Sequence, residues 1–290
     1  MANAQAPRTC VIMNPAARSQ RARDRVAQVR KLVGRDATLR LTRGPGDAEA
    51  IAERAVQQGY EIVVAAGGDG TINEVVNGLE GSNAKLGLLP TGTINVFAME
   101  LGIPFDLNAA WKIIKAHKVK KIDLATANGH CFVQLAGFGL DAQIVERTDS
   151  ETKNVLGPLS YLLTATAVAA ETPPKLVIKH DKGQTEGSFV VIGNGRLYAG
   201  PFSLFTEADI SDGYLDVCVF HQVNYLAIIR YLRGVLFGVH TQFSDVEYFK
   251  SKHIRVESNE RVPFEVDGEL IGHLPCDVHV YKHALQVIVP

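Results

Sequence analysis

The order of strand-like and helix-like segments constrains the fold of this chain more than any other feature. Over the first 118 residues, short apolar runs alternate with segments whose apolar residues recur at helical spacing. The strand-like runs are 9–13, 37–42, 60–66 and 86–90, and the helix-like segments are 19–33, 47–58, 71–79 and 93–101. Such alternation predicts a parallel sheet with helices on both faces.

The pattern changes after Lys118. The β-like runs that follow are 120–126, 130–137, 175–180, 188–194, 214–220, 253–258 and 262–267. Turn signals such as Asn128-Gly129 and Asp267-Gly268 separate them, and helix-like stretches at 154–171 and 223–239 interrupt them. This half predicts a mostly antiparallel sandwich or barrel, with a domain boundary near residue 120. A cleft between two such domains is where we expect a ligand.

Composition agrees with an ordinary globular protein. The chain has 290 residues, of which 46% are hydrophobic and 21% charged, enough for one large domain or two modest ones. It begins without a basic-then-apolar leader, and no apolar run reaches the roughly 20 residues that span a bilayer. The four cysteines are scattered, which favours reduced, buried thiols in a cytoplasmic protein.

Basic residues are concentrated near the beginning of the chain. Residues 1–45 contain ten lysines and arginines against only Asp24 and Asp36. This excess predicts an anionic ligand or surface, although a solvated basic helix face explains it equally well. Basic and aromatic residues do not interleave in the manner of RNA-binding proteins, so we expect no nucleic-acid partner.

A glycine-rich turn follows the strand-like run 60–66. The glycines of Gly67-Gly68-Asp69-Gly70 permit positive φ and close approach of a ligand to the backbone. Thr71 and Glu74 match a capping box at the start of the next helix, and a helix N-terminus suits phosphate. The next unit repeats the design, with the turn 90–93 before a helix that begins near Thr93. In a parallel sheet both turns lie at one edge, where they could face one polyphosphate.

Asp69 is an unusual residue for such a turn, because a bare carboxylate repels phosphate. It makes chemical sense if Mg²⁺ lies between the two charges, or if it polarises an attacking hydroxyl. The chain has neither a P-loop nor a G-x-G-x-x-G after its first strand. Either role of Asp69 indicates phosphoryl transfer. The alternative is an ordinary βα turn in which Asp69 caps backbone amides.

An ordered series of motifs resembles the diacylglycerol kinase catalytic family, which includes bacterial soluble lipid kinases and the sphingosine and ceramide kinases. The series is Asn14-Pro15, GGDGTINEVVNGL (67–79), LGLLPTGTINVFAMELGIP (86–104), AGFGLDA (136–142), Asp212-Gly213 and FEVDGE (264–269). GGDGT also occurs in NAD kinases, whereas the continuation from LLPTGT to LGIP is specific to the lipid kinases. The resemblance covers nearly the whole chain.

The resemblance implies two domains and a kinase reaction. A Rossmann-like domain of the NAD kinase/diacylglycerol kinase type would span residues 1–120, and a last strand near 284–290 would return to it. A β-sandwich lipid-binding domain would span 121–283. ATP would donate its γ-phosphate to a lipid hydroxyl in the cleft, with Mg²⁺ required. By position, the residues around the nucleotide would be Asn14, Gly67, Gly68, Asp69, Gly70, Thr71, Glu74, Gly92 and Thr93, with Thr42 a further candidate.

The resemblance also assigns catalytic and metal-binding roles. Glu269 matches the general base proposed in bacterial members, and Asp69 is its main competitor. Asp267-Gly268 alone reads as a simple hairpin turn, which is compatible with a base at its tip. In similar proteins a structural Mg²⁺ lies in a loop that corresponds here to Asp209, Asp212 and the carbonyl of Tyr214.

One loop departs from the family pattern. The family usually follows Asn-Pro with a small residue and Ser-Gly, whereas here Ala16, Ala17 and Arg18 follow Asn14-Pro15. We hypothesise that Arg18 supplies a cation in place of a P-loop lysine. The altered loop keeps open a catalytically weak lipid- or nucleotide-binding regulator, and GGDGT keeps open an NAD kinase-like enzyme.

Two apolar stretches bear on the lipid. Residues 155–170 carry no charge but are too short to span a bilayer. Residues 225–239 place Arg230 and Arg233 among apolar residues, which suits the surface of an anionic membrane. Both helices could instead simply cover the sandwich. We therefore expect a cytoplasmic lipid kinase, peripheral at the inner face of the membrane; the lipid and the oligomeric state, a homodimer included, stay open.

Overall fold

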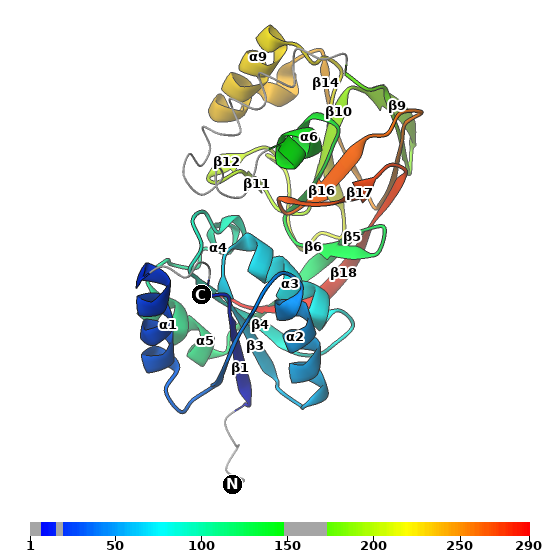
Figure 1. Ribbon diagram of the computed structural model, residues 1–290. Helices are drawn as coiled ribbons and strands as arrows, with labels where there is room; N and C mark the ends of the chain where they lie inside the picture. The colour runs from blue at the N-terminus through cyan, green and yellow to red at the C-terminus, as the bar shows by residue number, and fades with distance from the viewer. Residues whose placement is uncertain (1–6, 16–19, 148–172) are drawn as a thin grey trace. The chain divides into compact units, whose positions relative to one another are not determined.

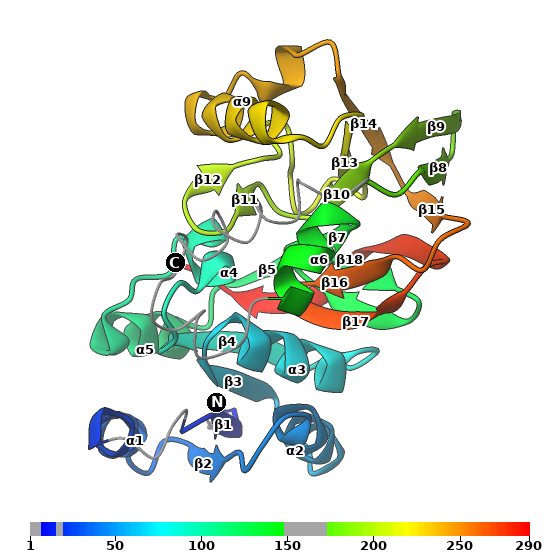
Figure 2. The ribbon, with the colours of Figure 1, turned by 45° about the horizontal axis from the view of Figure 1, so that its top comes forward.

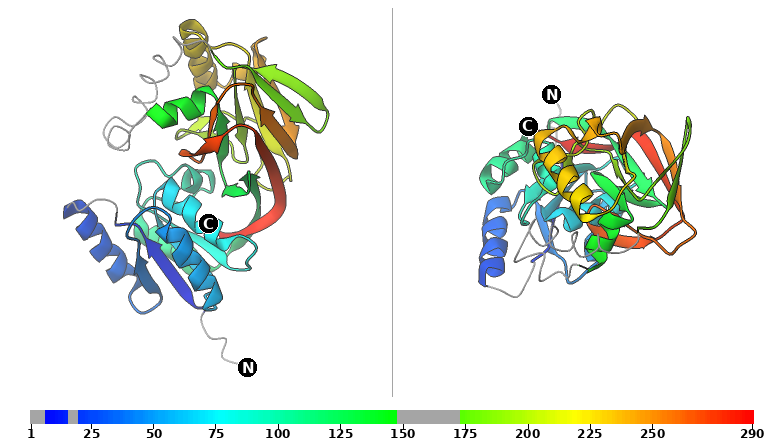
Figure 3. Two further views of the ribbon diagram at one scale, coloured as in Figure 1. Left: turned by 45° about the vertical axis from the view of Figure 1, so that its right-hand side comes forward. Right: turned by 90° about the horizontal axis from the view of Figure 1, so that it is seen from above.

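The computed structural model describes residues 7–15, 20–147 and 173–290, which form two compact units (Figures 1 and 3). Unit 1 comprises Met1–Ile122 and His283–Pro290, and unit 2 comprises Asp123–Lys282. These limits lie close to those that the sequence suggests at 120 and 284. Arg18 and the predicted helix 154–171 lie outside the described residues.

Unit 1 is built on a parallel sheet of order β2-β1-β3-β4, beside which the end of β18 runs parallel to β4. The strands are β1 Thr9–Met13, β2 Thr38–Leu41, β3 Ile62–Gly67, β4 Lys85–Pro90 and β18 Cys276–Ile288. β1 and β3 are buried along their whole length, as strands covered on both faces must be. The predicted α/β fold is confirmed.

Helices cover both faces of this sheet, α1 packing with α5 and α2 with α3 (Figures 1 and 2). They are α1 Gln20–Val33, α2 Asp47–Gln57, α3 Asp69–Leu79, α4 Val96–Glu100 and α5 Leu107–Ala116. The sequence prediction lacks α5. Its signals are an aspartate cap, in which Asp106 accepts a hydrogen bond from the Ala109 amide at 2.8 Å, and buried Leu107, Trp111 and Ile114 at helical spacing.

The predicted starts of α3 and α4 are wrong. α3 begins at Asp69, so Thr71 lies inside the helix and cannot be its N-cap. Glu74 Oε2 instead accepts a hydrogen bond from the Ala48 amide at 2.9 Å and thereby caps α2. α4 begins at Val96 rather than near Thr93, because Asn95 adopts the left-handed conformation with φ of 58°.

Unit 2 contains two antiparallel sheets. One has the order β14-β13-β10-β7-β16-β17; the other contains β18-β15-β8-β9, with β5 paired to β18 and β6. The strands are β5 Val119–Ala127, β6 His130–Phe132, β7 Leu135–Phe138, β8 Leu176–His180, β9 Gly183–Gly187, β10 Phe189–Gly193, β13 Leu215–Phe220, β14 Val246–Ser251, β15 His253–Glu257, β16 Pro263–Val266 and β17 Glu269–His273, with the small pair β11 Leu197–Tyr198 and β12 Phe202–Ser203. One core joins Phe138 and Phe264 of the first sheet to Ile178 and Ile254 of the second, which confirms the predicted sandwich.

The helical elements of unit 2 are α6 Leu140–Arg147, α9 Tyr225–Phe237 and the short 3₁₀ helix η1 His240–Gln242. α9 falls within the predicted stretch 223–239. Asn224 caps it by accepting a hydrogen bond from the Ala227 amide at 2.9 Å, and Gly238 ends it with φ of 66°. None of the helices in the described ranges is long and apolar enough to cross a membrane. All four cysteines are buried free thiols.

Candidate active site

The carboxyl ends of the parallel strands in unit 1 bring together the loops that the sequence analysis singled out. The Asn14 amide, after β1, donates to the Ala66 carbonyl at 3.2 Å. The amide of Thr42, a buried residue after β2, donates to the Met13 carbonyl at 2.9 Å. The ends of β1, β2 and β3 are thereby tied to one another. Ligands of open α/β sheets bind at this edge.

The two glycine turns touch through their backbones, as the parallel sheet predicts. A Cβ added at Gly92 would lie 2.4 Å from the Cα of Gly68, and the Gly92 amide donates to the Gly67 carbonyl at 3.1 Å. The buried Asn95, which sequence reasoning missed, fixes the second turn. Its Nδ2 donates to the Gly92 carbonyl at 2.9 Å, and its Oδ1 accepts from the Gly92 amide at 3.3 Å.

Lack of space for a Cβ atom, rather than backbone conformation, requires glycine at positions 67 and 92. None of Gly67, Gly68, Gly70 and Gly92 has positive φ, contrary to the reason expected from the sequence. A Cβ on Gly67 would lie 2.4 Å from the Cβ of Thr71, which is itself buried. Thr71 therefore packs beneath the turn. Thr93, by contrast, is exposed.

Asp69 is the first residue of α3, and its Oδ1 accepts a hydrogen bond from the Phe97 amide at 3.3 Å. It therefore holds the first turn of α4 to the start of α3. This geometry matches the amide-capping alternative that the sequence analysis kept open. The Asp69 side chain is half-buried at this position beside the glycine turns.

The guanidinium of Arg25 lies beside these turns, whereas the predicted Arg18 lies outside the described residues. Arg25, an exposed residue of α1, donates from Nη1 to the Thr91 carbonyl at 3.0 Å. Sequence reasoning counted Arg25 only among the basic residues of the first 45. The signal that could have identified it is its place near the start of the first helix, which faces the carboxyl edge of the sheet. Arg8 and Arg40 are instead directed to the ring of Tyr60.

The predicted hairpin turn at Asp267-Gly268 is present in unit 2, with φ of 48° and 86° at its two residues. The Asp267 carboxylate accepts three hydrogen bonds of 3.0 Å from the consecutive amides of Val133, Gln134 and Leu135. These bonds explain why the predicted strand 130–137 breaks into β6 and β7. They also fix the turn from which the exposed Glu269 begins β17.

Two buried carboxyl groups, which sequence reasoning missed, lie together in unit 2. Asp141 on α6 is 5% exposed and Glu265 on β16 is 1% exposed, and both side chains lie over Gly137. Burial, followed by the charge and hydrogen bond of Asp141, raises the pKa of Glu265 well above its usual range. Burial also raises the pKa of Asp141, which accepts a hydrogen bond from the Tyr198 hydroxyl. The neutral form of Glu265 is therefore favoured over its ionised form in the folded protein. The sequence signal was a glutamate between Phe264 and Val266 in a buried strand.

Asp141 also lies in the wall of an apolar cavity of about 340 Å³ within unit 2. The lining is formed by Leu140, Asp141, Ile144, Phe189, Val191, Tyr198, Ala199, Phe202, Leu204, Phe220, Ile228, Tyr231, Leu232, Val235 and Leu236. Aliphatic and aromatic side chains dominate it, as in pockets that bury apolar ligands.

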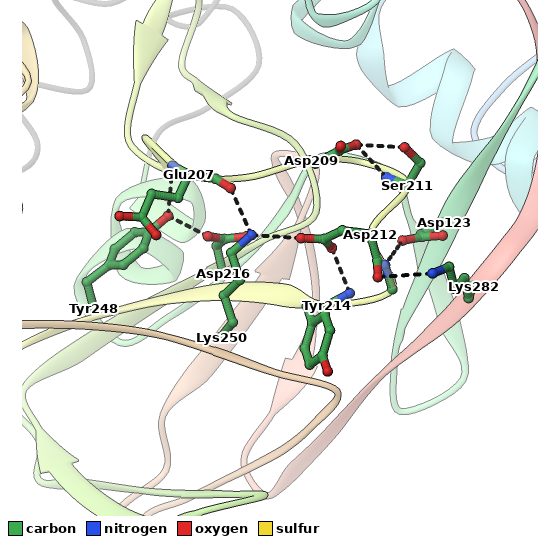
Figure 4. A network of polar contacts seen from close by, with 11 residues as sticks. Asp123, Glu207, Asp209, Ser211, Asp212, Tyr214, Asp216, Tyr248, Lys250 and Lys282 are labelled. Atoms are coloured by element: carbon green, nitrogen blue, oxygen red, sulfur yellow. Dashed lines mark hydrogen bonds and ion pairs between the residues drawn. The ribbon is translucent and has the colours of Figure 1, made fainter.

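In the loop with the predicted metal ligands Asp209, Asp212 and Tyr214, the two carboxylates contact donors of the protein (Figure 4). Asp212 Oδ2 forms an ion pair with Lys250 Nζ at 2.7 Å, and its Oδ1 accepts from the Tyr214 amide. Asp209 Oδ1 accepts from the amide and hydroxyl of Ser211. In the part of the chain that the structure describes, no three His, Cys, Asp or Glu side chains are grouped to hold a metal.

Comparison with known proteins places this geometry in a family. Residues 8–127 match the diacylglycerol kinase catalytic domain, and residues 134–289 match the YegS C-terminal NAD kinase beta sandwich-like domain. The chain therefore belongs to the diacylglycerol kinase family. It is an ATP-dependent lipid kinase, as the sequence analysis predicted.

Individual relatives agree with this assignment. The diacylglycerol kinase of Staphylococcus carnosus is 32% identical over 89% of this chain and 86% of its own length. That of Staphylococcus aureus strain Newman is 31% identical, over 89% and 83%. A crystal structure of a diacylglycerol kinase from Bacillus anthracis str. Sterne superposes with a TM-score of 0.80 at 27% identity, covering 98% of this chain and 97% of that one.

Proposed function

We propose that this chain transfers the γ-phosphate of ATP to the free hydroxyl of diacylglycerol or a closely related lipid at a membrane surface. The observation that carries the choice of a lipid acceptor is the apolar cavity of unit 2. A cavity of about 340 Å³ with aliphatic and aromatic walls accommodates part of an acyl chain, whereas a dinucleotide needs polar partners. The names of the relatives support the same acceptor.

For the nucleotide, we propose the joined glycine turns of unit 1. Amides at the start of α3, the exposed hydroxyl of Thr93 and the guanidinium of Arg25 would contact the phosphates. Gly67, Gly68 and Gly92 keep the backbone accessible, while Thr71, Glu74 and Asn95 hold the turns and helices in place. Asn14 and Thr42 complete this edge of the sheet.

Mg²⁺ fits the donor set at these turns. It commonly binds through one or two carboxylates together with substrate phosphates, and Asp69 supplies a carboxylate at the right turn. When bound, the ion would neutralise phosphate charge. Asp69 would orient the nucleotide while holding α4.

Glu269 is the general base in this proposal. It would take the proton of the lipid hydroxyl as the oxygen attacks the γ-phosphorus and ADP leaves. An exposed carboxylate beside the fixed turn at Asp267 suits this role, because the turn limits its movement while its exposure leaves it accessible to a substrate. Asp69 is the competing base.

The test is transfer of radiolabel from γ-labelled ATP with Mg²⁺ to diacylglycerol, a sphingoid base and NAD, each offered separately. We expect label in diacylglycerol, and a kcat reduced about 100-fold or more by Glu269→Gln with little change in the KM for ATP. Asp69→Asn should raise the KM for ATP as well as lower kcat. The exposed Asp36→Asn, from a surface ion pair with Lys115, is the matched control and should behave as wild type. Label in NAD, or in none of the three, would refute the proposed acceptor.

Membrane contact is proposed through α9. Leu226, Leu236 and Phe237 are 76%, 60% and 67% exposed, and Arg233 is exposed beside them. Leu236 also lines the cavity, so a lipid could pass along this helix from the bilayer. Arg230 takes no part in this proposal, because it is paired with Asp245.

A further inference from the structure

A lysine side chain lies among the acceptors of the segment 207–216, which comprises the loop 207–214 and the first two residues of β13 (Figure 4). Lys250 comes from β14, and its Nζ lies 2.7 Å from Asp212 Oδ2 and 3.6 Å from Asp216 Oδ2. The same ammonium donates to the Glu207 carbonyl at 2.8 Å. The Lys250 ammonium therefore links Glu207 and Asp216, at the two ends of this segment, to Asp212 between them.

This ion pair is largely removed from water. The Asp216 side chain is 1% exposed, and those of Lys250 and Asp212 are each 28% exposed. The Tyr248 hydroxyl also donates to Asp216. A buried carboxylate that loses its cation is strongly destabilising, so the ammonium is an integral part of this fold.

Protein donors also engage the other acceptors of the loop. Asp212 Oδ1 accepts from the Tyr214 amide at 2.9 Å, and the Asp212 carbonyl accepts from Lys282 Nζ at 3.3 Å. Asp209 Oδ1 accepts from Ser211 Oγ at 2.7 Å. Asp123, which is fully buried, accepts from the Gly213 amide at 2.6 Å.

These contacts do not fit the structural Mg²⁺ that the family resemblance implies. Mg²⁺ requires six oxygen ligands in near-ideal octahedral geometry, and the carboxylates here are directed to an ammonium and to amide hydrogens. A divalent ion on Asp212 would also be repelled by Lys250. We propose that the Lys250 ammonium is the resident cation of this loop in place of a divalent metal. The stability of unit 2 is then independent of divalent cations, and the metal requirement of the enzyme is confined to the nucleotide.

The test uses the full chain without nucleotide. Protein treated with a chelator and then desalted is melted with and without added Mg²⁺ or Ca²⁺, and its metal content is measured by mass spectrometry. We expect no stoichiometric divalent metal. Added Mg²⁺ or Ca²⁺ should change Tm by less than about 1 °C, because only an ion that binds the folded state in preference to the unfolded state would raise Tm. Lys250→Met should lower Tm by about 4 °C or more. Lys175→Met, from an exposed pair with Glu186, is the matched control and should shift Tm by less than about 1 °C.

Two results would overturn the proposal. One is a wild-type protein that retains one divalent ion per chain, or whose Tm falls on chelation and recovers with the metal. The other is a Lys250→Met variant whose Tm equals that of the wild type. If Lys250→Met does not fold, the wild-type measurement with and without chelator still decides between ammonium and metal.

Discussion

At the scale of single residues, several carboxylates that resemble ligands hold the backbone of this protein. Asp69 accepts from an amide of α4, Glu74 from an amide of α2, and Asp267 from three amides of one bend. A hydrogen bond to a charged group contributes about 1.5–3 kcal/mol, so each substitution affects structure as well as chemistry. Loss of activity in an Asp69 variant must therefore be compared with its Tm.

Substitution of Arg25 tests the proposed nucleotide site and leaves the structural carboxylates unchanged. Arg25→Ala should raise the KM for ATP by about 10-fold with a smaller change in kcat, because it removes a charge-assisted contact of about 1.4 kcal/mol from the bound phosphates. Steady-state kinetics with varied ATP measure this. Arg30→Ala, in the last turn of the same helix, is the control and should keep the wild-type KM. An unchanged KM in Arg25→Ala would exclude Arg25 from phosphate binding.

The Asp141–Glu265 pair predicts a pH dependence of stability. The folded state keeps a proton on Glu265 at pH values where the unfolded chain, with a pKa near 4.5, has released it. Because the folded state then binds more protons, the free energy of unfolding falls as pH rises from about 4.5 through the raised pKa.

Glu265→Gln removes that titration and keeps an acceptor for the Gly268 amide. The free energy of unfolding is measured with urea at about pH 5 and about pH 8. Its decrease between these pH values should be smaller in the variant than in the wild type by about 1 kcal/mol or more, since one pKa unit corresponds to 1.36 kcal/mol. Glu260→Gln, at an exposed position, is the control, and its free energy of unfolding should decrease with pH as much as that of the wild type. Parallel pH profiles for wild type and Glu265→Gln would contradict a raised pKa of Glu265 in the folded protein.

At the scale of elements, α9 has one apolar face that is buried against the sheet and one side that exposes apolar side chains. Ala227, Ile228 and Tyr231 are buried against Phe189 and Phe220 of the sheet. The exposed side carries large apolar side chains that a helix serving only to cover the sandwich would not need. This arrangement is typical of a helix that lies at a membrane interface.

Leu226→Glu tests that role, because Leu226 is 76% exposed and does not line the cavity. We expect binding to anionic vesicles to weaken by about 5-fold or more, while phosphorylation of a short-chain, water-soluble diacylglycerol stays unchanged. Vesicle sedimentation and kinetics measure the two effects. Lys252→Gln, at an exposed position elsewhere in unit 2, makes the same change of one charge unit and controls for charge alone. Equal vesicle binding by wild type and Leu226→Glu would remove α9 from the interface.

At the scale of the whole molecule, the chain begins and ends in the same unit. Gln286 and Val287 of β18 pair in parallel with Lys85 and Leu86 of β4. Leu285, Val287 and Ile288 are at most 3% exposed. The sheet of unit 1 is therefore incomplete without residues 285–288.

Val287→Asp should consequently destabilise unit 1. Burying an unpaired carboxylate in place of Val287 should lower Tm by about 5 °C or more and weaken nucleotide binding. Thermal melts and binding of a fluorescent ATP analogue measure both. Ala284→Asp, at an exposed position of the same strand, should leave both unchanged. Wild-type behaviour of Val287→Asp would mean that the last strand is dispensable for unit 1.

The sequence by itself determined the parallel sheet, the sandwich, the hairpin turn at Asp267 and the family. These features follow from local patterns, because periodic burial selects strand or helix and a two-residue Asp-Gly loop selects the turn. The helix α5 was missed although its cap and apolar spacing are local. Other features depended on the tertiary structure. Glu74 caps a helix 26 residues away, and Lys250 meets Asp212 across 38 residues. Such partners come from segments that only packing and strand register bring together, so no local pattern encodes which acceptor a polar side chain will reach.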